Sequence, residues 1–138
     1  MANSVLKGCG IHHIALNVSD FEKSLRFYTE GLGFQVYRQW GDPQRRIAMI
    51  DVGDGCCMEI FSNAQPRTCV DTEAGNYIHL AFRVPDTKAA FARALEFGAE
   101  PLTEPKFVEI QSDPVLPVWL SFVKGPDGEE LEFFQPVE

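Results

Sequence analysis

Apolar and polar residues alternate in several short stretches of the first half of the chain, as they do in half-buried β-strands. The strands expected from this alternation cover residues 11–18, 34–40, 46–52 and 56–62. After the first strand the apolar positions recur at helical spacing instead, and they are Phe21, Leu25, Tyr28 and Leu32. Ser19 and Glu22 have the spacing of a capping box at the start of this helix. The pattern therefore predicts one strand, one helix and three strands, in that order.

The second half repeats this order of elements. A strand is expected at 77–84, followed by a helix that Asp86 or Thr87 caps and that ends at Gly98. The next strands are expected near residues 99–103, 117–123 and 129–135. Three prolines leave the segment 104–117 open between a loop and a strand with a long connection. We therefore predict an α+β fold in one domain over residues 1–138, with tandem βαβββ modules at 8–62 and 77–138 and a polar linker at 63–76.

The two modules also repeat residues that can bind a metal. The first has His13 in its first strand and Glu59 in its last, and the second has His79 and Glu132 in the corresponding strands. The two histidines are 66 residues apart and the two glutamates 73, so the second copy is longer between them. Imidazole nitrogens and carboxylate oxygens are ligands of divalent transition metals. The repeat therefore indicates one metal site, built where the two half-domains meet.

The alternation of side chains along a strand distinguishes the two adjacent histidines of the first module. His12 falls on the same face as the apolar residues of its strand, whereas His13 falls on the opposite face. In the second module Ile78 stands where the first has His12, and His79 corresponds to His13. We therefore predict His13 as a ligand and His12 as a structural residue at the end of the apolar row.

The same alternation separates Glu59 and Glu132 from the apolar side of their strands. An ionised carboxylate on the concave, aromatic-lined face of a sheet costs free energy unless it is paired or bound to a metal. A single His or Glu on a strand is more often an ordinary polar residue, but four at equivalent places of a repeat favour a metal site. The alternative is a binding protein that retains these residues without a metal.

Composition limits the partners of the chain. Its formal net charge is −8 at pH 7, so nucleic acids and anionic membranes are unfavourable partners, and an anionic substrate needs a local basic pocket. The sequence contains no run of 18 apolar residues, so no membrane span is expected. The four cysteines have neither CxxC nor framework spacing, and the chain does not begin with an apolar signal segment. These features favour a cytoplasmic protein with reduced thiols.

Motifs in both modules resemble the vicinal oxygen chelate superfamily, and glyoxalase I (lactoylglutathione lyase) in particular. The first module contributes His13, Ser19-Asp20, Phe27-Tyr28 and Leu32-Gly33-Phe34, and the second contributes 79–84, Pro126-Asp127-Gly128 and Leu131-Glu132. The resemblance covers nearly the whole chain. It implies the glyoxalase/bleomycin resistance/dioxygenase fold, in which two modules form a curled mixed sheet around a metal. The implied metal ligands are His13, Glu59, His79 and Glu132, together with water.

The resemblance also implies a reaction. Glyoxalase I converts the hemithioacetal of methylglyoxal and a thiol into an S-lactoyl thioester, by proton transfer next to a metal-bound carbonyl. We assign Glu132 as the base, with Glu59 as its counterpart on the other side. The implied cofactor is Ni²⁺, Co²⁺ or Zn²⁺, and Mn²⁺ or Fe²⁺ also fit the ligands. Small bacterial glyoxalases of this length are usually homodimers with sites at the subunit interface, so we expect a homodimer.

Substrate contacts depart from the pattern of the family. Several glyoxalases hold a glutathione carboxylate with an arginine four residues after the first metal histidine, and here that residue is Asn17. Its counterpart in the second module is Arg83, which either takes over the anion contact or is a charge at the rim. Asn63 matches a position that contacts glutathione. The family resemblance also implies a pair of lysines in the C-terminal part. That pair is not evident here, and its only candidates are Lys106 and Lys124.

Three other functions of the superfamily are alternatives. A methylmalonyl-CoA epimerase abstracts a proton beside an acyl thioester in the same way, but usually has Gln where Glu59 stands. Dioxygenases and fosfomycin-modifying thiol transferases use a His-His-Glu triad, so a fourth ligand argues against them. Drug-binding members lack the metal ligands altogether. The small-molecule substrate is therefore expected to be a thiol hemithioacetal or an acyl thioester.

Overall fold

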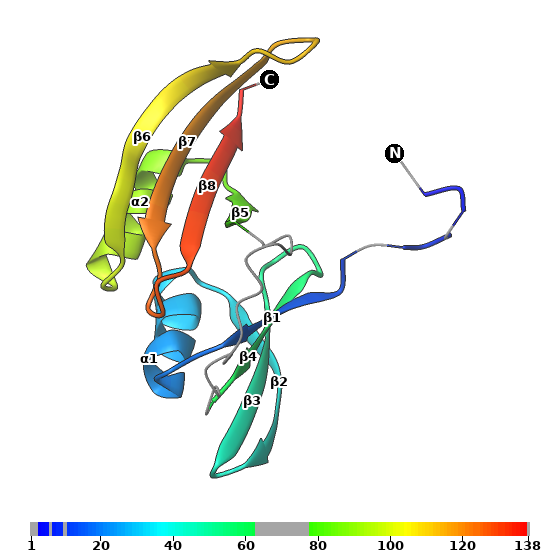
Figure 1. The fold of residues 1–138 in the computed structure, drawn as a ribbon, viewed down its shortest axis with the longest axis vertical. Coiled ribbons are helices and arrows are strands. Elements are labelled where there is room, and N and C mark those ends of the chain that lie inside the picture. The colour runs from blue at the N-terminus through cyan, green and yellow to red at the C-terminus, as the bar shows by residue number, and fades with distance from the viewer. Residues whose placement is uncertain (1–2, 6, 10, 63–77, 138) are drawn as a thin grey trace, which may run out of the picture.

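The structure, a computed structural model, describes residues 3–5, 7–9, 11–62 and 78–137. The predicted linker at 63–76 lies outside the described residues. The strands form two separate four-stranded sheets, in the orders β1-β4-β3-β2 and β5-β8-β7-β6 (Figure 1). Each sheet is mixed, because its first strand runs parallel to its last and the remaining pairs are antiparallel. The predicted α+β fold with two βαβββ repeats is confirmed, and the two sheets do not close on each other.

The first module has the elements that the residue pattern predicted. They are β1 (His13–Asn17), α1 (Phe21–Arg26), a π-helical turn η1 (Phe27–Gly31), β2 (Gln35–Asp42), β3 (Arg45–Asp51) and β4 (Cys57–Phe61). The helix is capped by Asp20, whose carboxylate accepts from the Lys23 N–H at 3.0 Å. The capping-box prediction was therefore wrong about Ser19, because the neighbouring aspartate takes the cap position.

The second module repeats this order, and its last three strands are longer than their counterparts in the first. Its elements are β5 (Leu80–Arg83), α2 (Thr87–Glu96), β6 (Glu100–Ile110), β7 (Leu116–Lys124) and β8 (Glu130–Pro136). Asp86 caps α2 by accepting from the Ala89 N–H at 3.0 Å. Of the two readings of segment 104–117, the strand is correct over most of its length, since β6 continues to Ile110 and β7 begins at Leu116.

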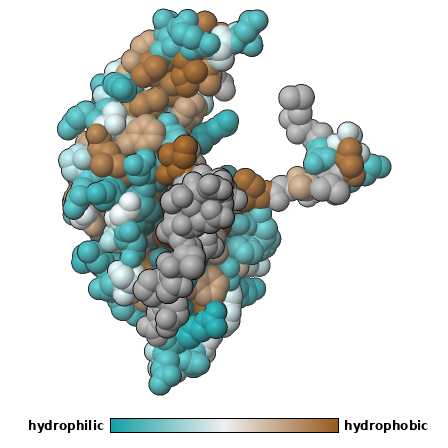
Figure 2. Space-filling model, viewed as in Figure 1, coloured by the Kyte–Doolittle hydropathy of each residue, from teal (hydrophilic) through white to brown (hydrophobic). Residues whose placement is uncertain are grey.

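One hydrophobic core joins the two modules on the helix side of the sheets. Ala48, Ile50, Met58 and Ile60 of the first sheet are buried in it. The second module contributes Phe82, Phe91, Val123, Leu131 and Phe133 to the same core. The opposite faces are much more open, and every residue of β2 is exposed. Apolar residues also gather where β6 and β7 meet at the top of the molecule, and exposed members of this group are Phe107, Ile110, Val115 and Leu116 (Figure 2).

A group of hydrogen bonds, here called the intermodule clasp, ties the helical segment of the first module to the β7–β8 turn of the second. The buried Tyr28 hydroxyl donates to Glu129 Oε1 at 2.5 Å. Asp127 accepts from the Ser19 N–H at 2.8 Å and from Ser24 Oγ at 3.1 Å. Glu129 Oε2 also accepts from the Asp127 N–H at 2.8 Å. The clasp fixes the turn from which β8 departs.

Replacing Tyr28 with Phe is expected to lower the free energy of unfolding by about 1–3 kcal/mol at neutral pH, because Glu129 loses a donor in a largely buried place. Burial, assisted by Glu129 and Asp127, raises the pKa of Tyr28 well above its usual value. The unfolded chain therefore loses this proton first, and the wild-type protein loses stability as the pH rises above about 10.

Urea unfolding at a series of pH values measures both effects. The Tyr28→Phe variant is expected to lack this contribution to the alkaline loss, and Tyr37→Phe, at an exposed tyrosine, serves as the control. Equal stability of the wild type and the Tyr28→Phe variant would show that the clasp contributes nothing.

No helix in the described part of the chain is long and apolar enough to cross a membrane. Cys9, Cys56 and Cys57 are free thiols. Cys69 lies outside the described residues.

Candidate metal centre

The first half-site consists of His13 and Glu59 on adjacent parallel strands. In the register of β1 and β4, Ala15 stands opposite Glu59 and His13 opposite Cys57. The His13 side chain therefore reaches along the sheet to Glu59, and its Nε2 lies 3.3 Å from Glu59 Oε2. Glu59 is 9% exposed, whereas the His13 side chain remains partly open to solvent.

The second half-site has the same construction. Ala81 of β5 stands opposite Glu132 of β8, and His79 Nε2 lies 3.0 Å from Glu132 Oε2. Glu132 is 7% exposed. The His79 ring packs edge-on against Phe122, with the ring centroids 5.3 Å apart. Equal registers in the two sheets thus give two His–Glu pairs of nearly equal geometry.

These pairs fit the ligands of a divalent metal. Two ligand atoms bound at right angles lie about 3 Å apart when each metal–ligand distance is about 2.1 Å. The observed Nε2–Oε2 separations of 3.3 and 3.0 Å match this value. Each carboxylate is also largely withdrawn from water with a single imidazole beside it, an arrangement that a cation stabilises.

The structure does not bring all four predicted ligands together. No group of three or more His, Cys, Asp or Glu side chains forms a metal cluster among the residues it describes. Each chain instead presents two separate pairs, one on each sheet. Two ligands leave most positions of a divalent metal open, so each pair can serve only as half of a four-ligand protein site.

The surroundings of Glu132 suit a group that accepts and releases protons. Burial raises the pKa of Glu132, and the neighbouring His79 partly offsets this by favouring the charged carboxylate. A carboxylate with a raised pKa is a stronger base than an exposed one. Burial and the His79 contact therefore act on the pKa of Glu132 in opposite directions.

His12 has a place in the site that the sequence pattern did not predict. Its side chain is exposed rather than packed in the apolar row. Its Nδ1 lies 2.9 Å from Nδ1 of His13, and the two rings meet edge to face. If His13 binds a metal through Nε2, its Nδ1 carries the proton and donates to His12. The doubled histidine in the sequence was the available signal.

The structure describes two of the three predicted substrate contacts, Asn17 and Arg83. Asn17 pairs with Phe61 at the end of β1, and Arg83 pairs with Phe134 at the end of β5. Both are exposed, and both share the face of the nearby glutamate, in agreement with strand alternation. Asn63 lies outside the described residues.

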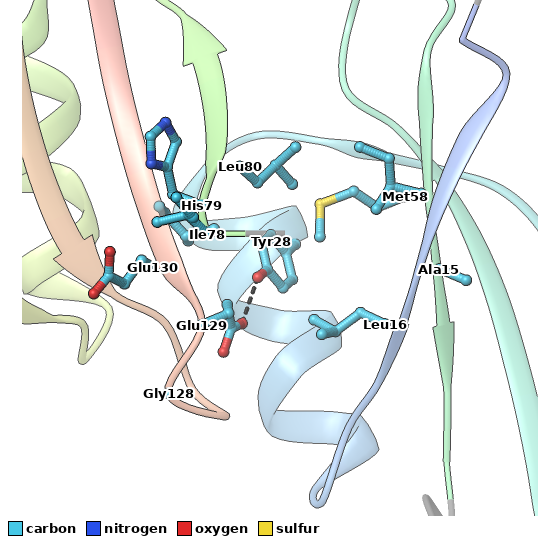
Figure 3. Close-up of a pocket in the computed structure, with 12 residues that line it drawn as sticks. Ala15, Leu16, Tyr28, Met58, Ile78, His79, Leu80, Gly128, Glu129 and Glu130 are labelled. Atoms are coloured by element: carbon cyan, nitrogen blue, oxygen red, sulfur yellow. Dashed lines mark hydrogen bonds between the residues drawn. The ribbon is translucent and has the colours of Figure 1, made fainter. Parts of the chain in front are cut away.

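A pocket of about 480 Å³ opens between the modules, on the side of the helices. Leu16 and Met58 of the first module lie across from His79 and Leu80 of the second, and the Tyr28–Glu129 hydrogen bond of the clasp lies between the two groups (Figure 3). Its walls are mostly apolar. The pocket therefore offers room for a small apolar group beside the second half-site.

Comparisons with known proteins identify the family to which the chain is similar. The model of the Glyoxalase/Bleomycin resistance protein/Dioxygenase superfamily matches residues 10–133. The protein YwkD of Bacillus subtilis is 35% identical over 128 residues, which cover 91% of this chain and 95% of that protein. A lactoylglutathione lyase of Neisseria meningitidis is 31% identical over 132 residues, covering 89% and 88%. The structure of a glyoxalase family protein from Enterococcus faecalis has a TM-score of 0.69 at 29% identity, covering 91% of this chain and 96% of that one.

Proposed function

Because the chain belongs to the Glyoxalase/Bleomycin resistance protein/Dioxygenase superfamily, we propose that it is a metal-dependent, glyoxalase I-like lyase. Its reaction would be the conversion of the hemithioacetal of methylglyoxal and a thiol into the S-lactoyl thioester. The observation that carries this proposal is the pair of His–Glu contacts at equivalent places in the two sheets. Its similarity to a lactoylglutathione lyase supports the same reaction.

The residues that would hold the metal are His13, Glu59, His79 and Glu132. Resemblance to small bacterial glyoxalases favours nickel, cobalt or zinc, and this set of nitrogen and oxygen ligands is also compatible with manganese or iron. When bound, the metal would stabilise the negative charge that develops on the two adjacent oxygens of the substrate. The proposed cellular location is the cytoplasm.

Glu132 would remove the proton from the carbon that carries the sulfur and return it to the neighbouring carbon. Its carboxylate is largely buried beside His79 in the second half-site, and it would leave its place as a ligand to accept the proton. Glu59 would act as its counterpart on the opposite side of the substrate. Asn17, Asn63 and Arg83 are the proposed contacts to the thiol part of the substrate.

A homodimer would complete the site. Each chain presents two half-sites on separate sheets, so the first half-site of one copy can combine with the second half-site of another. The open faces of both sheets and the exposed apolar residues of β6 and β7 support such an assembly. A twofold axis would then generate two equivalent metal sites per dimer.

The test is an assay of the purified protein loaded separately with Ni²⁺, Co²⁺ or Zn²⁺. Loss of the methylglyoxal–glutathione hemithioacetal is followed beside proton exchange of methylmalonyl-CoA, which reports epimerase activity. We expect turnover of the hemithioacetal with at least one metal. Proton exchange without hemithioacetal turnover would replace the lyase by an epimerase, and absence of metal binding would overturn the whole proposal.

Replacing His12 with Phe is expected to weaken metal binding by about tenfold, because a histidine ligand depends on the partner of its other ring nitrogen. The value of kcat at saturating metal should change little. His12→Asn is the matched variant, since its amide oxygen can accept from His13 Nδ1 and should retain most of the affinity. Titration against a competing chelator measures the affinities, and equal affinity of the Phe variant and the wild type would remove His12 from the site.

A further inference from the structure

A β-bulge in β2 decides which of its side chains lie on the face of the first half-site. Val36 pairs with Ile50, and the next paired residue, Arg38, stands opposite Met49, so that Tyr37 is an extra residue in the strand. Strict alternation from Val36 would place Arg38 on the core side of the sheet. The bulge reverses this alternation and turns Arg38 to the opposite face. Bulges often redirect a side chain in this way beside functional sites.

The pairing of the strands then places Arg38 in the same row as Glu59. Arg38 pairs with Met49, and Met49 pairs with Glu59, so the three side chains lie side by side across the sheet. Two strand spacings separate Arg38 from Glu59, which is about 10 Å. Trp40 lies in the next row, opposite Ile47. A cation and an aromatic ring thus flank the half-site on its outer strand.

Both side chains are free to contact a ligand. Arg38 is exposed and lies over the Tyr37 ring at 4.4 Å, and its Nη1 donates to the Tyr37 carbonyl at 2.8 Å. The guanidinium has five N–H donors, so most remain available. It forms no ion pair within the described part of the chain, whereas Arg26 pairs with Glu30. Trp40 is 45% exposed.

We infer that Arg38 binds an anionic group on the thiol carrier of the substrate, with Trp40 packed against the adjoining part of that carrier. The inference rests on the proposed function, because it assigns a substrate class to the same site. Arginine is suited to this contact because its planar N–H groups match carboxylate and phosphate oxygens. In a chain of net charge −8, this local cation provides what an anionic substrate needs. The substrate class is therefore a thiol adduct whose carrier has a carboxylate or phosphate within reach of the Arg38 side chain.

Steady-state kinetics test the inference on the reaction. The substrates are methylglyoxal hemithioacetals of glutathione, which is anionic, and of 2-mercaptoethanol, which is neutral. Arg38→Gln is expected to raise KM for the glutathione adduct about tenfold and to leave kcat nearly unchanged, because a charge-assisted contact to the carrier is lost. The neutral adduct should show no change. Arg38→Lys should recover part of the loss, and Arg26→Gln, which removes an equal charge from α1, should behave as the wild type.

Ligand binding tests the inference independently of turnover. Trp119→Phe leaves Trp40 as the reporter of fluorescence, and this protein is titrated with S-methylglutathione and with coenzyme A. We expect quenching by at least one probe, with a Kd about tenfold higher after Arg38→Gln. The probe that binds distinguishes a carboxylate carrier from a phosphate carrier. If the wild type turns over neither adduct but binds a probe through Arg38, the proposed function fails and the anion contact stands.

Three results would overturn the inference. The first is that neither probe binds the wild-type protein. The second is that Arg38→Gln and Arg26→Gln bind the probes equally well. The third is that Arg38→Gln changes the oligomeric state at unchanged probe affinity, which would make Arg38 a contact between copies of the chain.

Discussion

Replacing Glu132 with Gln is expected to lower kcat for hemithioacetal conversion by about 10³-fold, which is the usual contribution of a positioned general base. Glu132 supplies the carboxylate of the second half-site. The residue is 7% exposed, and its Oε2 lies 3.0 Å from His79 Nε2. Glutamine has almost the same size and retains an oxygen for the metal, but it cannot accept a proton. The variant should therefore fold normally and still bind metal, although with lower affinity. The measurement is kcat at saturating metal, with the metal content determined on the same samples.

Two further variants make this result specific. Glu96→Gln removes a carboxylate at the end of α2, where Glu96 pairs with Arg93, and it should leave kcat unchanged. Glu59→Gln tests the counterpart role in the first half-site. If Glu132→Gln turns over substrate within twofold of the wild type while Glu59→Gln does not, the assignment of the base must be reversed.

The strand faces of the candidate ligands could be predicted from the sequence because strand alternation is local. His13, Glu59, His79 and Glu132 each lie within a regular strand or next to its first residue, and the parallel pairing of first and last strands then brings them together in pairs. Alternation failed for His12. This residue precedes β1, so its ring is not fixed on the apolar side and turns instead to His13.

Arg38 could not be placed from the sequence, because neither Tyr37 nor Arg38 is a glycine that would indicate a bulge. Strict alternation would have assigned Arg38 to the core side of β2. The bulge is defined only by the pairing with β3.

Long-range contacts limited the remaining predictions. Ser19 has the sequence of a cap, but its N–H donates to Asp127, which lies 108 residues away, and Asp20 caps the helix instead. In segment 104–117, Pro105 suggested a loop. The outer strand β6 accommodates this proline because its pairing with β7 is irregular between Thr103 and Lys106. Proline is tolerated at such positions, where no ladder hydrogen bond is lost.

Mixing two inactive variants is expected to restore activity if each metal site is shared between two chains. His13→Ala destroys the first half-site and His79→Ala the second, so each variant alone should have no turnover above background. In a mixed dimer one site receives both defects, and the other receives the intact first half-site of one chain and the intact second half-site of the other. Random exchange makes half of the dimers mixed, so the equimolar sample should recover roughly a quarter of wild-type activity and bound metal.

A second mixture identifies the cause of any recovery. His13→Ala combined with Glu59→Ala, which removes the carboxylate ligand altogether, places both defects in the first half-site, so every dimer site lacks one ligand and no activity should return. If the four ligands instead met within one chain, neither mixture would recover activity, because each chain would carry its own damaged site. Recovery in both mixtures would show that a single substitution does not abolish the site. Recovery in the first mixture alone is therefore the result that the two separate His–Glu pairs of the chain predict.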